Sequence, residues 1–130
     1  MITKPIPYGR QHITDEDIQC VIDALKSDYL TQGPKIKEFE EAFASYVGCK
    51  YAIAVNNATA GLHLAATALD VNLGDKVIVT PLTFAASANC IRFRGGEVVF
   101  CDVEEDTYLM DIKKLSRLLS QSPKGTYKGI

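Results

Sequence analysis

The stretch YAIAVNNATAGLHLAATAL, residues 51–69, decides the fold of this 130-residue chain. Its first part, Tyr51 to Val55, is a short apolar run that is typical of a strand buried on both faces of a parallel sheet. From Thr59 onward the period changes, and apolar residues recur at helical spacing at Leu62, Ala65, Ala66 and Leu69. The stretch therefore predicts a strand, a polar turn and a helix.

The turn between these two elements consists of small or polar residues, Asn56-Asn-Ala-Thr59. The first amides of a helix have no partner within it, and the helix dipole favours negative charge there, so a phosphate would fit this turn. The ordinary alternative is that Asn57 or Thr59 only caps the helix. Taken alone, the four residues favour simple capping.

The rest of the chain repeats the alternation of strand and helix. The expected elements are, in order, an extended arm over 4–13, helices over 14–27 and 34–47, the strand and helix of 51–69, a strand over 76–80, a helix over 83–94, a strand over 97–102, a helix from Asp111 and the start of a strand at 128–130. Such alternation indicates right-handed βαβ crossovers, and hence an α/β fold with a mainly parallel sheet.

Composition excludes several functions. The net charge is −2 and the basic residues are dispersed, so we expect no nucleic-acid partner. The N-terminus lacks an apolar leader and no apolar run approaches the roughly 20 residues that span a bilayer, so we expect no membrane contact and a cytoplasmic location. The cysteines are scattered without a C-x-x-C pair, so we expect neither metal nor disulfide and interpret all four as small buried side chains, namely Cys20, Cys49, Cys90 and Cys101.

Several motifs together resemble a known family. In order they are LTQGP (30–34), the stretch 51–69, GDKVIVTPLTFAASAN (74–89), GGEVVFCD (95–102) and DTYLMD (106–111). They are similar to the N-terminal part of the DegT/DnrJ/EryC1/StrS family of sugar aminotransferases, which depend on pyridoxal 5'-phosphate (PLP), and the match covers essentially the whole chain. PYGRQHI (7–13), LTQGP (30–34) and ASANC (86–90) look most like the pseudaminic acid branch of that family.

The resemblance implies a cofactor site. In this family the turn after the first strand holds the PLP phosphate through backbone amides, which here would be those of Ala58 and Thr59. This chain has Asn57-Ala58 where the family usually has Ser-Gly, and alanine does not easily adopt positive φ. The family also stacks an aromatic residue on the pyridine ring, which here would be Phe84. From the residues alone, Phe84 would be expected to pack in the core.

The resemblance also implies an activity. It is the transfer of an amino group from L-glutamate to C4 of a UDP-linked 4-keto-6-deoxy-N-acetyl sugar by a homodimer. The arm and the following turn would bind the UDP-sugar through Tyr8, Arg10, Thr31 and Gly33. The open alternatives are a PLP-dependent sugar dehydratase of the same family, and a non-catalytic module that binds phosphate or a nucleotide sugar.

The organisation expected from the family is an arm, helix and turn over 1–33, followed by a partial PLP-binding large domain of the type I aminotransferase fold over 34–130. The lysine that forms the Schiff base lies beyond residue 130 in this family, so no catalytic residue is expected here and the chain alone should be inactive. The middle strands of the sheet would also be missing. Residues 51–55 would then be unpaired among apolar side chains, and the isolated chain should be unstable.

Overall fold

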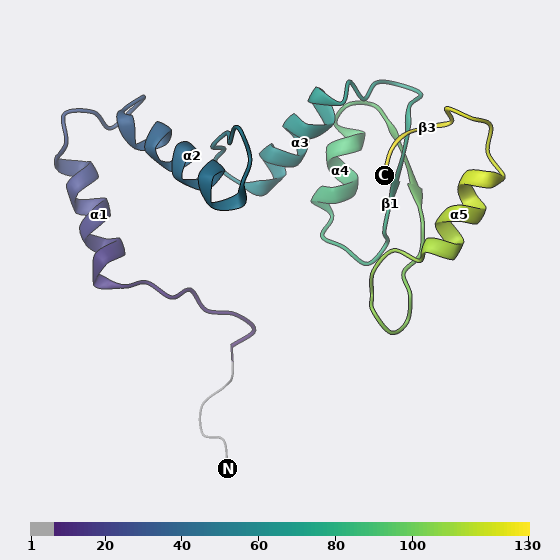
Figure 1. The fold of residues 1–130 in the computed structure, drawn as a ribbon, viewed down its shortest axis with the longest axis horizontal. Helices are drawn as coiled ribbons and strands as arrows, with labels where there is room; N and C mark the ends of the chain where they lie inside the picture. Colours follow the sequence, from purple (N-terminus) through teal and green to yellow (C-terminus); the bar gives the residue numbers. More distant parts are fainter. Residues whose placement is uncertain (1–6) are drawn as a thin grey trace, which may run out of the picture. The chain divides into compact units, whose positions relative to one another are not determined.

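The computed structural model describes residues 7–130, which fall into two compact units divided between Ala54 and Val55 (Figure 1). The first unit holds α1 (Asp15–Lys26) and α2 (Pro34–Val47). The second holds, in chain order, α3 (Ala58–Ala68), β1 (Lys76–Val79), α4 (Ala86–Arg92), β2 (Glu97–Phe100), α5 (Ile112–Ser120) and β3 (Tyr127–Gly129). Residues 4–6 of the predicted arm lie outside the described residues. The expected division at residue 33 stays a prediction.

The helices of the first unit begin and end where their local signals place them. A capping box starts α1: the Thr14 hydroxyl accepts from the Asp17 amide, and the Asp17 carboxylate accepts from the Thr14 amide at 2.8 Å. This backbone hydrogen bond from Thr14 lowers the pKa of Asp17. Pro34 is the first residue of α2, and Gly48 ends it in the left-handed conformation, at φ 71°. The two helices predicted over 14–27 and 34–47 are confirmed, with α1 shorter by one residue at each end.

The strand predicted at residues 51–55 is wrong for this structure. No strand forms there, and the Ile53 side chain is 79% exposed. The Ala54 amide donates instead to the half-buried Glu40 carboxylate of α2, at 2.8 Å. A strand exists only through hydrogen bonds to a neighbouring strand, and no described residue supplies one here. The expected lack of a partner is therefore found, but the side chains are exposed rather than enclosed among apolar ones.

A three-stranded parallel sheet of order β2-β1-β3 organises the second unit. The central strand β1 aligns Val77 with Val98 and Ile78 with Val99. The chain moves from β1 to β2 and then back past β1 to β3. Figure 1 shows α4 and α5 on opposite faces of the sheet. This is the arrangement expected when the direction of the connection reverses and each crossover keeps the usual right hand. The predicted α/β fold with a parallel sheet is confirmed.

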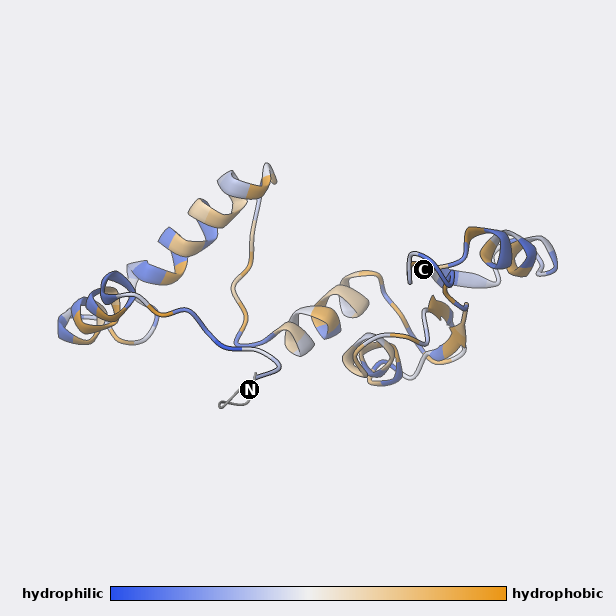
Figure 2. Cartoon of the chain, turned by 90° about the horizontal axis from the view of Figure 1, so that it is seen from below, coloured by the Kyte–Doolittle hydropathy of each residue, from blue (hydrophilic) through white to orange (hydrophobic). Residues whose placement is uncertain are grey.

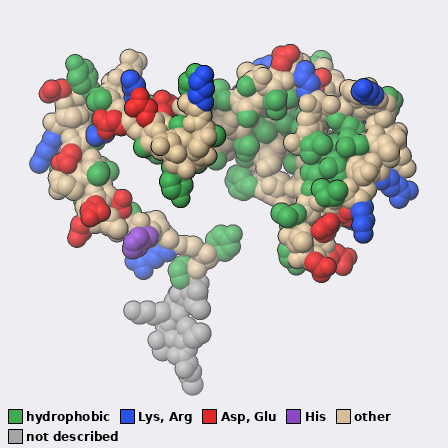
Figure 3. Space-filling model, in the orientation of Figure 1, with side chains coloured by type: hydrophobic (Ala, Val, Ile, Leu, Met, Phe, Trp, Pro, Cys, Tyr) green, Lys and Arg blue, Asp and Glu red, His purple; other side chains and the backbone are tan. Residues whose placement is uncertain are grey.

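The core of this unit lies between the sheet and the pair α3 and α4. Its buried residues are Ala66, Val71, Val77, Cys90 and Ile91, with Val79 and Val98 packed against them. Figure 2 shows hydrophobic residues along the strands and along both helices. Only Ala66 of the predicted α3 stripe is buried. Much apolar surface stays exposed, and Figure 3 shows it gathered on the visible face of this unit.

The prediction that all four cysteines are buried needs correction. Cys90 and Cys101 are buried as expected, but Cys20 of α1 and Cys49, which follows the C-cap of α2, are exposed. No described helix is long and apolar enough to cross a membrane.

The segment between β1 and α4 also departs from expectation. The helix was predicted to begin at Thr83, but it begins at Ala86, and residues 81–85 form an irregular loop. The cap residue of the observed helix is Ala85, whose methyl side chain cannot accept a hydrogen bond from the first amides. Phe84 therefore stays outside the helix and is 78% exposed, so its packing in the core is ruled out.

The close contact at Gly96 provides a test of this core. A Cβ atom at this position would lie 2.8 Å from both Ile91 Cγ2 and Val71 Cγ1, two core side chains. We expect Gly96→Ala to lower the free energy of unfolding by about 1–3 kcal/mol through overpacking. Urea titration followed by circular dichroism measures this.

Gly61→Ala is the matched control, because a Cβ there meets only Val55 Cγ2 at an ordinary 3.5 Å. Alanine inside a helix should stabilise the protein slightly, by up to about 1 kcal/mol. Equal destabilisation by both variants would contradict the packing described at Gly96.

Candidate functional site

The carboxyl ends of the parallel strands define one edge of the second unit. Helix α3 leads into β1 and α4 leads out of it, so both helices run antiparallel to the strands and begin at that edge. The His63 and Phe93 rings meet edge to face at 5.6 Å and align the two helices. Counting back from this contact at 1.5 Å per residue, Ala58 lies about 7.5 Å and Ala86 about 10 Å toward that edge. The start of α3 and the Phe84 loop therefore lie at a similar distance along the helix axes, near the carboxyl edge of the sheet.

The N-terminus of α3 has both a cap and free donors. The Asn57 side chain accepts from the Ala60 amide at 2.9 Å, and the Asn57 carbonyl accepts from the Gly61 amide at 3.2 Å. Within residues 7–130 the amides of Ala58 and Thr59 have no acceptor. Capping and anion binding are thus compatible, because the cap uses Ala60 and leaves two amides at the positive end of the helix dipole.

The Ala58 position accepts its alanine without strain. It is the first residue of α3, and the only described residues other than glycine with positive φ are Gln32, Asp70 and Tyr108. Alanine at this position therefore needs no positive φ.

The loop after β1 presents Phe84 at the same edge. The Phe84 carbonyl accepts from the Ser87 amide at 3.0 Å, and the Thr83 and Ser87 hydroxyls are 3.2 Å apart. The ring itself is largely exposed. An exposed aromatic face at the same sheet edge as free helix amides suits a flat ring carrying a phosphate.

The loop after β2 adds an ion pair that the sequence did not reveal. Lys114 of α5 donates to Asp102 at 2.8 Å. This hydrogen bond lowers the pKa of Asp102 and raises the pKa of Lys114. A hydrogen bond from the Val103 amide lowers the pKa of Asp102 further. The Lys114 ammonium is thus engaged by the Asp102 carboxylate. The only available signal was the position of Asp102 directly after a strand.

The pair borders a hollow of about 410 Å³ that also includes Pro81, Leu82 and Tyr108. Close by, Cys101 is buried, and burial raises the pKa of its thiol. An uncharged buried thiol is unreactive, so Cys101 is structural.

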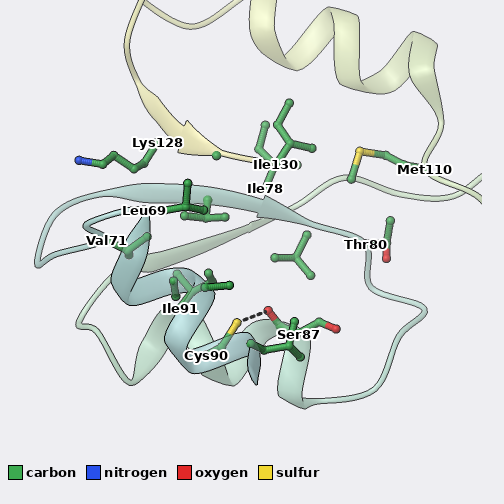
Figure 4. Close-up of a pocket in the computed structure, with 16 residues that line it drawn as sticks. Leu69, Val71, Ile78, Thr80, Ser87, Cys90, Ile91, Met110, Lys128 and Ile130 are labelled. Carbon is green, nitrogen blue, oxygen red and sulfur yellow. Dashed lines mark hydrogen bonds between the residues drawn. The ribbon is translucent and has the colours of Figure 1, made fainter. Parts of the chain in front are cut away.

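A second hollow, of about 310 Å³, is apolar (Figure 4). It lies between the helices α3 and α4 and the strands β1 and β3, with Leu69, Val71, Ile78 and Ile91 among its lining residues. The Cys90 thiol donates to the Ser87 carbonyl at 3.2 Å in its wall. The hollow contains no arrangement of groups for acid–base or nucleophilic chemistry.

The four residues predicted to bind substrate all lie in the first unit and do not form a site there. Tyr8 and Arg10 are exposed in the arm before α1, whereas Thr31 and Gly33 follow it. The 12-residue helix α1 lies between the two pairs in the chain. Gly33 caps α2 and is tightly enclosed, since a Cβ there would lie 2.9 Å from Tyr29 Cβ. The substrate-binding role predicted for these four residues stays a prediction.

The comparisons with known proteins agree with the fold. The model of the DegT/DnrJ/EryC1/StrS aminotransferase family matches residues 11–126. The spore coat polysaccharide biosynthesis protein SpsC of Bacillus subtilis is 43% identical over 92% of the chain. The UDP-4-amino-4,6-dideoxy-N-acetyl-beta-L-altrosamine transaminase of Campylobacter jejuni is 44% identical over 90% of it. The chain spans about 31% of the length of both relatives.

Solved structures show the same similarity. Spr1654 of Streptococcus pneumoniae in its PLP form has a TM-score of 0.82 and 38% identity, over 86% of this chain and 29% of its own. The aminotransferase of Psychrobacter cryohalolentis has a TM-score of 0.78 and 36% identity, over 85% of this chain and 29% of its own. Since the family model covers most of its length and the fold agrees, the chain belongs to the DegT/DnrJ/EryC1/StrS aminotransferase family.

Proposed function

We propose that this chain supplies the phosphate site and the ring contact of a PLP-dependent nucleotide-sugar aminotransferase. The enzyme would move an amino group from L-glutamate to C4 of a UDP-linked 4-keto-6-deoxy-N-acetyl sugar, as in pseudaminic acid biosynthesis. One observation carries the proposal: two free helix amides, at Ala58 and Thr59, and an exposed aromatic ring, at Phe84, occur together at the carboxyl edge of a parallel sheet.

The donor set fits the phosphate. Two unpaired amides at a helix N-terminus can donate to two phosphate oxygens, and the small side chains at 58 and 60 leave room for a close approach. No carboxylate is present among residues 55–69 to repel an anion. Phe84 can cover one face of a pyridine ring, which removes both apolar surfaces from water.

The chemistry of transamination needs groups in addition to these. Bound PLP supplies the electron sink for the reaction. A lysine must move the proton, and Lys114, the lysine placed at this edge, is engaged by Asp102. We therefore propose that residues 1–130 bind and orient the cofactor, and that the lysine comes from outside them. In the proposed enzyme, a cytoplasmic homodimer, the arm residues Tyr8 and Arg10 bind the UDP-sugar.

The first test removes one of the two free amides. Thr59→Pro is tolerated in the first helical turn but has no N–H to give to a phosphate. We expect the affinity for pyridoxamine 5'-phosphate (PMP) to fall about tenfold or more, because a hydrogen bond to a charged group is lost. Equilibrium dialysis measures this, and PMP is the probe because it has no aldehyde to condense with surface lysines.

Glu16→Pro is the matched control, since Glu16 is likewise the second residue of its helix, α1, where no phosphate is proposed. Its PMP affinity should equal that of the parent chain. Unchanged affinity in Thr59→Pro would reject the phosphate site.

The second test removes the aromatic face. Phe84→Ala should weaken PMP binding about fivefold or more, equivalent to about 1 kcal/mol, since an aromatic contact is worth this much beyond its buried area. Phe100→Ala controls for the loss of an exposed ring, because Phe100 of β2 is 59% exposed and has no proposed role. If the two variants bound PMP equally well, Phe84 would not contact the cofactor.

The third test separates the two half-reactions of the enzyme that contains this chain. Arginine recognises a diphosphate through its planar, doubly donating group. Arg10→Ala should raise KM for the UDP-sugar about tenfold or more, by loss of charge-assisted hydrogen bonds, while the half-reaction with glutamate is nearly unchanged. Stopped-flow absorbance of the cofactor follows each half-reaction. Arg92→Ala is the control on another exposed arginine, and equal slowing of both half-reactions by Arg10→Ala would assign Arg10 to the fold or the dimer instead.

A further inference from the structure

We propose that Thr83 and Ser87 are positioning residues which hold the Phe84 ring at the orientation needed to receive the cofactor ring. The inference rests on the proposed function and extends it. It starts from one juxtaposition: the hydroxyls of these two residues, four positions apart, are 3.2 Å from each other and so bridge across Phe84.

Ser87 is the fixed end of this bridge. It is half-buried in the first turn of α4, next to the buried Ala86, and its carbonyl accepts from the thiol of the buried Cys90 at 3.2 Å. Figure 4 shows this Ser87–Cys90 hydrogen bond in the wall of the apolar hollow. The position of Ser87 is therefore set by the core.

Thr83 is the dependent end. It is exposed in the loop, and so are its neighbours Leu82 and Phe84. Within the described part of the chain, no side-chain hydrogen bond other than Thr83–Ser87 involves residues 80–85. The cap residue Ala85 also contributes none. The backbone bond from the Ser87 amide to the Phe84 carbonyl closes the turn but does not fix the residues before Phe84.

An exposed ring on an untied loop samples many orientations, and binding would then cost the entropy of selecting one. The hydroxyl bridge removes this cost in advance, which is preorganisation. Because either variant breaks the same bond, loss of both hydroxyls should be no worse than loss of one. This non-additivity is the signature of the bridge.

The first experiment follows the ring itself, without cofactor. The chain contains no tryptophan, so Phe84→Trp introduces a single tryptophan as the reporter at this position, and it is excited selectively over the six tyrosines. In that background we expect Thr83→Val, Ser87→Ala and the double variant to lower the fluorescence anisotropy of the reporter equally. Ser87→Thr, which keeps the hydroxyl, should restore the parent value.

Thr107→Val is the matched control, because it removes a hydroxyl bonded to Glu104 in the other loop at this edge. It should leave the anisotropy unchanged. Thermal unfolding of each variant shows whether the fold is intact. Unchanged anisotropy in folded Thr83→Val and Ser87→Ala variants would overturn the inference.

The second experiment titrates PMP and follows quenching of the same tryptophan. We expect Thr83→Val and Ser87→Ala to weaken PMP binding about two- to tenfold, the range that one neutral hydrogen bond is worth, with no further loss in the double variant. Lower anisotropy with unchanged PMP affinity would overturn the positioning role. If PMP neither binds nor quenches in the Phe84→Trp parent while the anisotropy changes appear, the bridge stands and the proposed cofactor site is wrong.

Discussion

The parallel pairing of β1 with a strand on each side is the constraint on which the second unit depends. Ile78, at the centre of β1, is 1% exposed, and its neighbours Val77 and Val79 contact the core helices. Because β2 and β3 both run parallel to β1, the chain must return along the length of the strands before each next strand can begin. That requirement brings the start of α3, the Phe84 loop and the Asp102 loop to one edge. The candidate site is thus a consequence of strand direction.

The same principle explains the segment that failed to form a strand. Residues 51–55 have the composition of a buried strand, yet strand hydrogen bonds join residues that are distant in sequence. Without a partner the backbone bonds to what is near, and the Glu40 carboxylate receives the Ala54 amide. Glu40 looks from sequence like one of several solvated charges on α2. Its half-buried carboxylate shows that one acidic side chain can accept a backbone hydrogen bond that a neighbouring strand would otherwise accept.

The candidate site combines groups of different origin. The free amides of Ala58 and Thr59 arise from helix geometry, which leaves the first donors unpaired in every helix. The Asn57 side chain accepts a hydrogen bond only from the Ala60 amide and so leaves the amides of Ala58 and Thr59 free. The exposure of Phe84 and the bridge between Thr83 and Ser87 instead depend on where α4 begins, which the burial of Ala86 and Cys90 in the core determines. The Asp102–Lys114 pair further depends on α5 returning to the end of β2.

The sequence by itself determined the features that arise within a few residues: the Thr14 capping box, Pro34 at the start of α2, the left-handed Gly48, the caps at Asn57 and Asp111, and the alternation that identifies a parallel α/β sheet. These signals are local, because each donor and acceptor lie within about one turn of each other. Only the tertiary structure decided which strand-like segments pair, that Phe84 is exposed, that Cys20 and Cys49 are exposed while Cys90 and Cys101 are buried, and that Lys114 forms an ion pair with Asp102. Pairing and burial join residues far apart in the chain, so no short pattern encodes them.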